Sequence, residues 1–100
     1  MKGKTIKQME HFLNEEGRIK ALPTKYSVKF LVLEYLAEKF QKGRIYTEKE
    51  VNEIVSRWHT FGDFYLLRRE LIDAGFLART SDGREYWRTE KTSDNIAEKA

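Results

Sequence analysis

The sequence predicts a mainly helical α+β fold: a winged helix-turn-helix with a three-helix core, a C-terminal β-hairpin wing and an extra N-terminal helix. Two observations lead to this prediction. Two short amphipathic helices joined by a tight turn are expected between residues 47 and 74, and an Asp-Gly turn flanked by short runs with aromatic residues follows them. Helix, turn, helix and hairpin is the order of elements in a winged helix-turn-helix domain.

Composition limits the class of protein. A chain of 100 residues suffices for one domain with its own core, assigned here to residues 1–89. Its lack of cysteine excludes disulfides and thiolate zinc sites, and no apolar run is long enough to span a membrane or serve as a signal peptide. The net charge is +3, and every cation between residues 57 and 88 is arginine, which suits bidentate contacts with phosphate and guanine. We therefore expect a cytoplasmic protein with no membrane partner.

An N-terminal helix is predicted for residues 5–16. Thr5 and Gln8 have the spacing of a capping box, and apolar residues follow at helical spacing until Gly17. Residues 18–23 alternate charged and apolar side chains and are predicted to be extended.

The first core helix is predicted for residues 24–41, with Thr24 or Ser27 as its N-cap. Its apolar residues form two stripes, one of Phe30, Leu33, Ala37 and Phe40 and the other of Val28, Leu31, Val32 and Tyr35. A helix that is apolar on nearly every side is buried against more than one neighbour. The first stripe should face the helix-turn-helix pair. We expect the N-terminal helix to cover the second stripe; the alternative is a homodimer formed through this face or through the N-terminal helix.

A short strand at residues 44–46 should lead into the second core helix, at residues 47–58, and pair with the later hairpin. Thr47 and Glu50 have capping-box spacing, because the side chain of each can bond to the backbone amide of the other. The third core helix is predicted for residues 61–74. Its inward face is expected to consist of Phe64, Leu67 and Leu71, packed against Leu33 and Phe40.

The wing is predicted for residues 76–89, around the turn at Asp82-Gly83, and residues 90–100 are predicted to be a mobile tail. Five aromatic residues lie at positions expected to close the core: Trp58, Phe61, Phe64, Phe76 and Tyr86.

Five residues are candidate DNA contacts. In helix-turn-helix docking the second helix of the motif enters the major groove, and its outward side chains meet bases and phosphates. Tyr65 and Arg69 are expected on that outward face, with Arg68 on its flank. Arg79 and Arg84 of the wing are placed to touch backbone phosphates or the minor groove.

The alternative assigns these cations to the protein itself. Arg68 then pairs with a carboxylate such as Glu34 or Glu50, and Arg69 is solvated at the surface. The charge of Asp82 offsets that of Arg84 at the tip of the hairpin.

Nothing in the sequence predicts catalysis. His11 and His59 are far apart in sequence and outside any metal-ligand spacing, and the chain has neither a glycine-rich phosphate loop nor a nucleophile elbow. We expect no enzymatic activity, no metal and no cofactor.

Several short runs resemble a known bacterial family. They are Gly17-Arg18-Ile19-Lys20 with Leu22-Pro23, Gly43-Arg44-Ile45-Tyr46-Thr47-Glu48-Lys49-Glu50-Val51-Asn52, Leu67-Arg68-Arg69-Glu70-Leu71, and Asp82-Gly83 with Tyr86-Trp87. On these runs the chain resembles domain-of-unknown-function family 2087 over roughly residues 8–88. The resemblance implies a winged-helix-like module associated with transcriptional regulation. It implies no particular ligand, operator or catalytic residue.

The expected function is that of a DNA-binding transcriptional regulator whose second motif helix enters the major groove. The alternative is a non-catalytic winged-helix module that binds another protein and no nucleic acid. A basic strip along Tyr65, Arg69 and Arg84 would favour DNA, whereas a neutral helix with an uncovered apolar patch would favour a protein partner.

Overall fold

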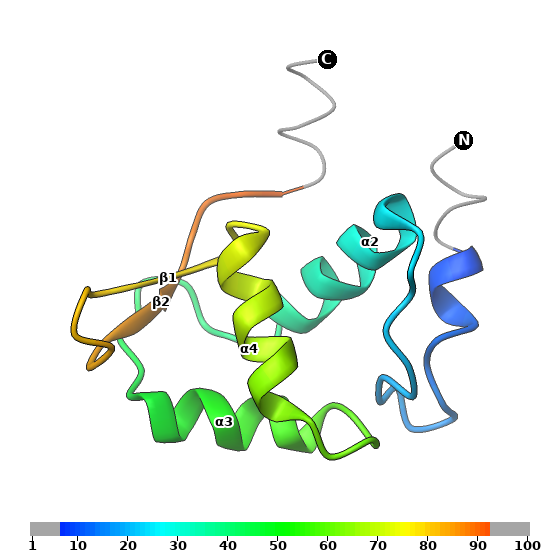
Figure 1. The fold of residues 1–100 in the computed structure, drawn as a ribbon, viewed down its shortest axis with the longest axis horizontal. Helices are drawn as coiled ribbons and strands as arrows, with labels where there is room; N and C mark the ends of the chain where they lie inside the picture. Colours follow the sequence, from blue (N-terminus) through cyan, green and yellow to red (C-terminus); the bar gives the residue numbers. More distant parts are fainter. Residues whose placement is uncertain (1–6, 93–100) are drawn as a thin grey trace.

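The computed structural model describes residues 7–92 and has the mainly helical α+β, winged-helix layout that the sequence predicts. Its elements are α2 (Tyr26–Ala37), α3 (Glu48–Arg57), α4 (Phe64–Asp73), β1 (Leu77–Arg79) and β2 (Tyr86–Arg88). Helices α3 and α4 cross steeply, and α2 lies on one side of α4 while the β1–β2 hairpin lies on the other (Figure 1). No helix within residues 7–92 is long and apolar enough to cross a bilayer.

The predicted N-terminal helix at residues 5–16 is too long, because the helical turn of the structure ends at residue 10. The side chain of Asn14 accepts hydrogen bonds from the backbone N–H groups of Glu16 and Arg18, both at 2.9 Å. Such local bonds compete with a helix for the same backbone groups. The proposed Thr5 cap lies outside the described residues.

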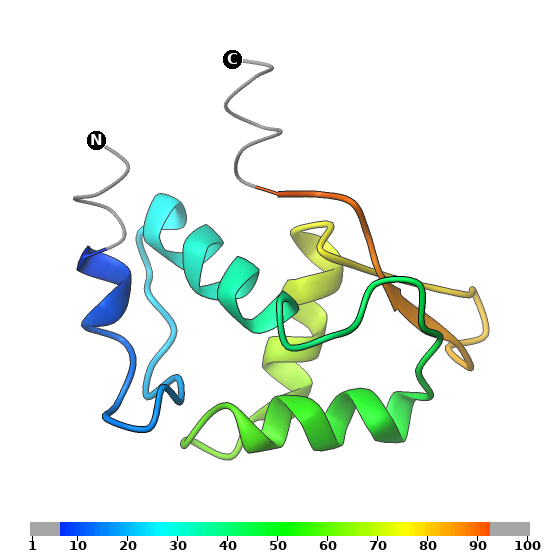
Figure 2. The ribbon, with the colours of Figure 1, turned by 180° about the vertical axis from the view of Figure 1, so that it is seen from behind.

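Residues 18–23 are extended, as predicted, and run beside α2 (Figure 2). Ile19 is fully buried; its N–H donates to the carbonyl of Trp58 at 2.7 Å, and its carbonyl accepts from Thr60 at 3.0 Å. The hydroxyl of Tyr35, on the second stripe of α2, donates to the carbonyl of Gly17 at 2.6 Å. The chain therefore supplies cover for this stripe from its own N-terminal segment.

Helix α2 is shorter than the predicted 24–41. It begins after Lys25, whose side chain makes no capping hydrogen bond, so the predicted caps at Thr24 and Ser27 are wrong. Its last residue is Ala37, because the chain then turns and buries Phe40 with its ring centroid 5.2 Å from that of Tyr46.

Helix α3 begins at the predicted capping box. The Glu50 N–H donates to the Thr47 hydroxyl at 3.1 Å, and the Thr47 N–H donates to the Glu50 carboxylate at 2.9 Å. The Thr47 amide lowers the pKa of Glu50, with smaller contributions from the Thr47 hydroxyl and Arg44. Just before this cap, Tyr46 pairs with Tyr86 of the hairpin through two N–H···O bonds of 2.8 Å, so the predicted pairing with the hairpin is confirmed. The strand predicted for residues 44–46 is wrong, because the pairing consists of this single bridge.

Helix α4 begins at Phe64, three residues later than the predicted 61–74. Gly62 has φ +67°, which lies outside the right-handed helical region. Buried His59 then fixes the start of the helix: its Nδ1 lies 2.7 Å from the Val55 carbonyl, and its Nε2 accepts from the Asp63 N–H at 2.8 Å. Asp63 is the N-cap, and its carboxylate accepts from the Leu66 N–H.

The predicted inward face of α4 is right for Leu67 and Leu71 and wrong for Phe64. Both leucines are fully buried in one apolar cluster that includes Leu33 and Phe40. Phe64 is 39% exposed, because it is the first residue of α4 and projects beyond the core.

The other expected core aromatics divide in the same way. Phe76 and Tyr86 are buried and Trp58 is half-buried, whereas Phe61 is exposed. Phe61 precedes α4, and its ring packs on that of His59 with centroids 4.7 Å apart.

The hairpin pairs β1 and β2 antiparallel, with Leu77 opposite Arg88 and Arg79 opposite Tyr86. Its turn includes Gly83, whose φ of +73° favours glycine. The predicted tail at 90–100 is tied to the domain at its start, since Lys91 Nζ donates to the Ala74 carbonyl at 2.6 Å. Residues 93–100 of that prediction lie outside the described residues.

Candidate nucleic-acid interface

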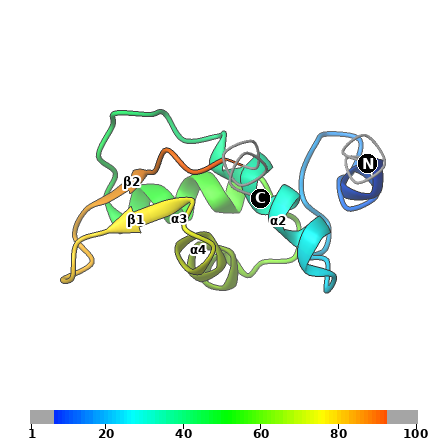
Figure 3. The same ribbon diagram turned by 90° about the horizontal axis from the view of Figure 1, so that it is seen from above.

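Figure 3 shows the β1–β2 hairpin beside α4. An open groove of about 420 Å³ lies between α4 and the hairpin, near the start of α3. We call it the α4–hairpin groove. Its lining comprises Glu48, Tyr65, Arg68, Arg69, Ile72, Asp73, Arg79, Ser81, Asp82, Gly83 and Tyr86. Four of the five predicted DNA contacts, all except Arg84, are therefore brought to one surface.

Arg68 is held by the protein itself. Its guanidinium donates to the side-chain oxygen of Asn52 and lies 3.6 Å from the carboxylate of Glu48, and its side chain is 14% exposed. These two partners are four residues apart on the face of α3 that meets α4, so the predicted partners Glu34 and Glu50 are wrong. Arg68 thus links the two helices of the motif.

Glu48 extends this link to the wing. It accepts a hydrogen bond of 3.3 Å from the hydroxyl of Tyr86 on β2. Burial is the main cause that raises the pKa of the Tyr86 hydroxyl, with the nearby carboxylate of Glu48 adding to it and Arg68 opposing it. Polar contacts therefore join α3, α4 and β2 at the base of the groove.

Arg69 is the accessible arginine of α4. Its side chain is 69% exposed, and its Nε lies 3.7 Å from the carboxylate of Asp73, one turn further along the helix. An exposed ion pair of this kind contributes about 0–1 kcal/mol to stability. Arg69 can therefore exchange Asp73 for another anion at little cost. Tyr65, also exposed, lies one turn earlier on the same side of α4.

The wing cations have mostly local contacts. Arg79 donates to the carbonyl of Thr80 at 3.2 Å. Arg84 is highly exposed and lies 3.7 Å from the carboxylate of Asp82, which is the pairing that the alternative interpretation expected. The hydroxyl of Thr80, followed by the backbone N–H of Arg84, lowers the pKa of Asp82.

The groove is mixed in charge, so it lacks the basic strip that would favour DNA over a protein partner. Its cations and its carboxylates are equal in number: Arg68, Arg69 and Arg79 against Glu48, Asp73 and Asp82. The spacing of Arg69 and Asp73 can be read from the sequence, but the positions of Glu48 and Asn52 depend on how α3 and α4 cross. The sequence prediction missed both residues for this reason.

One comparison with known proteins gave a result. A family model described as an uncharacterized protein conserved in bacteria (DUF2087) matches residues 18–88, which contain the three core helices and the hairpin. No curated protein and no solved structure gave a match.

Proposed function

The chain belongs to domain-of-unknown-function family 2087, whose description states no function, and we propose that it binds duplex DNA and regulates transcription. The observation that supports the proposal is the α4–hairpin groove, where α4 and the hairpin together present Tyr65, Arg69 and Arg79. A helix flanked by a hairpin suits a duplex, since the helix can enter the major groove while the hairpin meets the adjacent backbone.

The candidate residues have different roles in this proposal. Arg69 and Tyr65 contact base edges or phosphates, and Arg79 and Arg84 contact phosphates beside the major groove. Arg68 is a positioning residue, because its contacts with Glu48 and Asn52 hold α4 against α3.

The carboxylates of the groove should limit its affinity for DNA. Phosphate must compete with Asp73 for Arg69, so we expect modest affinity for random DNA. This affinity should fall as the salt concentration rises, because binding releases counterions from the DNA and their release is less favourable at high salt. This competition gives the proposal a sharp test, because Arg69 and Asp73 should affect DNA binding in opposite directions.

The test is fluorescence anisotropy with labelled random duplex DNA at low and moderate salt. Arg69→Gln should weaken binding by about 1–3 kcal/mol. Asp73→Asn should strengthen it, because the variant frees Arg69 and removes a negative charge from the groove. Lys20→Gln is the matched control, since Lys20 is exposed and does not line the groove.

Thermal unfolding of each variant separates binding from folding, and both groove variants should keep the stability of the parent within about 0.5 kcal/mol. Absence of binding at low salt, or a change in the same direction for Arg69→Gln and Asp73→Asn, would contradict the proposal.

A second candidate function is a protein-interaction module, favoured by exposed aromatic residues at the start of α4. Phe61, Phe64 and Tyr65 are exposed and nearly consecutive in the chain. If the partner is a second copy of the chain, sedimentation should detect self-association that Phe64→Ser abolishes. If the parent is monomeric and binds DNA, self-association is excluded and the DNA-binding proposal stands.

A further inference from the structure

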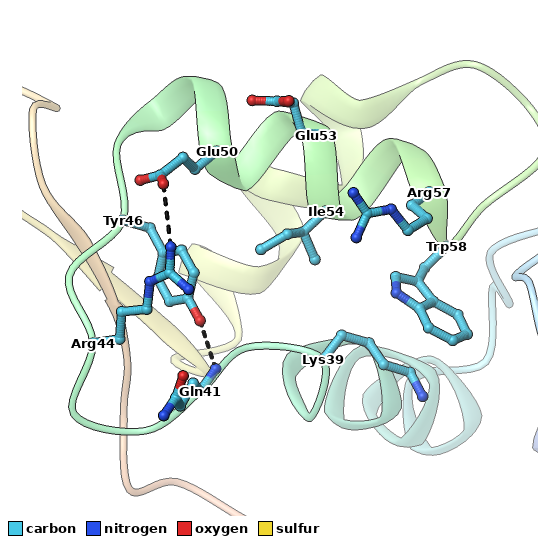
Figure 4. A pocket seen from close by; sticks show the side chains of 9 residues that line it. All are labelled: Lys39, Gln41, Arg44, Tyr46, Glu50, Glu53, Ile54, Arg57 and Trp58. Carbon is cyan, nitrogen blue, oxygen red and sulfur yellow. Dashed lines mark hydrogen bonds and ion pairs between the residues drawn. The ribbon is translucent and has the colours of Figure 1, made fainter.

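A second groove lies between α3 and the segment that follows α2 (Figure 4). We call it the α2–α3 groove. Its volume is about 410 Å³, and it shares no lining residue with the α4–hairpin groove. Small-molecule sites commonly fall within about 300–1,000 Å³, so the groove has the size for a small ligand.

Three cations from separate segments surround this groove: Lys39 after α2, Arg44 before α3 and Arg57 at the end of α3. Arg44 and Arg57 lie on opposite sides of Ile54 in Figure 4, where the guanidinium of Arg57 points toward the hollow. Arg44 is 3.3 Å from the carboxylate of Glu50. The guanidinium of Arg57, in contrast, has no ion-pair or hydrogen-bond partner within residues 7–92.

The two carboxylates of the groove leave Arg57 available. Glu50 is occupied by the Thr47 amide at 2.9 Å and by Arg44. Glu53 lines the rim, and Figure 4 shows its carboxylate directed away from the hollow. The inner part of the groove therefore has an excess of positive charge.

Apolar surface lies beside these charges. Ile54 and Trp58 are half-buried and line the groove next to Arg57. Lys39 Nζ lies 4.1 Å from the ring centroid of Trp58 and 4.2 Å from that of Tyr35, within cation–π range. The ammonium group is thereby fixed at one end of the groove.

We propose that the α2–α3 groove binds a small organic anion, with a carboxylate or phosphate head group and a short apolar body. The head group bonds to the planar fork of Arg57, while Lys39 and Arg44 add positive charge around it. The body packs on Ile54 and the edge of Trp58. This site is independent of the proposed DNA interface and can be tested without DNA.

The test is an NMR titration of the full ¹⁵N-labelled chain with benzoate, phenyl phosphate, inorganic phosphate and benzylamine. Benzoate or phenyl phosphate should give saturable shifts at the Trp58 indole N–H, the Arg57 side-chain N–H and the Ile54 amide. The tighter of the two probes identifies the preferred head group. Inorganic phosphate, which lacks the apolar body, should bind more weakly, and benzylamine, which has the wrong charge, should not shift these signals.

Arg57→Gln should weaken binding of the better probe about tenfold or more, as expected when a charge-assisted hydrogen bond is lost. Lys49→Gln is the matched control, because Lys49 is an exposed cation of the same helix that lines neither groove. It should bind the probe as the parent does, and both variants should keep the parent's thermal midpoint.

Shifts that do not saturate, equal shifts with benzylamine, or unchanged affinity in Arg57→Gln would overturn the proposal. Equal affinity for inorganic phosphate and phenyl phosphate would also overturn it, because the apolar wall would then contribute nothing.

Discussion

Helices α2 and α4 lie side by side in the core, yet their burial differs: the buried residues of α2 are spread around the helix, whereas those of α4 lie on one side. On α2, Val32, Leu33 and Leu36 are all buried, and the N-terminal segment covers the side of Tyr35. On α4, burial is concentrated on one side. An apolar pattern around a whole helix fixes it within the protein, whereas a one-sided pattern leaves a surface for recognition.

The first prediction tests the two sides of α4 against each other. Leu71→Ala should destabilise the protein by about 2–5 kcal/mol, because Leu71 is fully buried and its removal leaves a cavity. Tyr65→Ala, on the exposed side, should cost about 0.5 kcal/mol or less. Urea unfolding followed by circular dichroism measures both changes. Similar losses for the two variants would show that α4 is not one-sided.

The sequence predicts the elements whose ends are determined locally. The capping box at Thr47 fixes the start of α3, and the Asp82-Gly83 turn fixes the hairpin, because each uses bonds between near neighbours in the chain. The other helix ends depend on how side chains pack in the folded core, even where the partners lie only four to six residues apart in the chain. His59 holds the N-cap of α4, and Phe40 turns away from α2 to meet Tyr46. Periodicity contains no record of such contacts.

The candidate sites show the same division. The outward position of Arg69 follows from helical spacing, and the structure places it in the α4–hairpin groove. The α2–α3 groove was not predicted, because Lys39, Arg44 and Arg57 come from three segments that meet only in the fold. That the guanidinium of Arg57 has no partner among residues 7–92 likewise becomes visible only when its surroundings are known.

The second prediction tests the cover over α2. Gly17 and Gly43 both have left-handed φ values, +79° and +78°, so alanine at either position should cost about 1–2 kcal/mol. A Cβ at Gly17 would lie 2.8 Å from the Tyr35 hydroxyl oxygen, whereas one at Gly43 would meet nothing within 4 Å.

Gly17→Ala should therefore be the more destabilising of the two by about 0.5–1.5 kcal/mol, since Tyr35 must shift and lose its hydrogen bond. Thermal and urea unfolding of the two variants give this difference directly. Equal losses would mean that the contact between the N-terminal segment and α2 adds nothing to stability.

The third prediction, with the smallest expected effect, tests the hydrogen bond between Tyr35 and Gly17. Tyr35→Phe removes the bond to the Gly17 carbonyl while keeping the ring in place, so at neutral pH it should cost about 0.5–1.5 kcal/mol. The edge-on packing of Tyr35 with Trp58, at a centroid distance of 6.4 Å, should be unaffected. Urea unfolding at pH 7 measures this loss.

The pH dependence of this variant separates the hydrogen bond from packing. Burial, followed by the charge of Glu38, raises the pKa of the Tyr35 hydroxyl above its ordinary value. The unfolded chain therefore ionises first, and the stability linked to the neutral hydroxyl declines as pH rises from about 10 through the raised pKa. Tyr35→Phe lacks this decline, so its stability deficit relative to the parent should shrink between pH 9 and about pH 10.5. A deficit that stays constant over that range would show that Tyr35 titrates alike in the folded and unfolded chains.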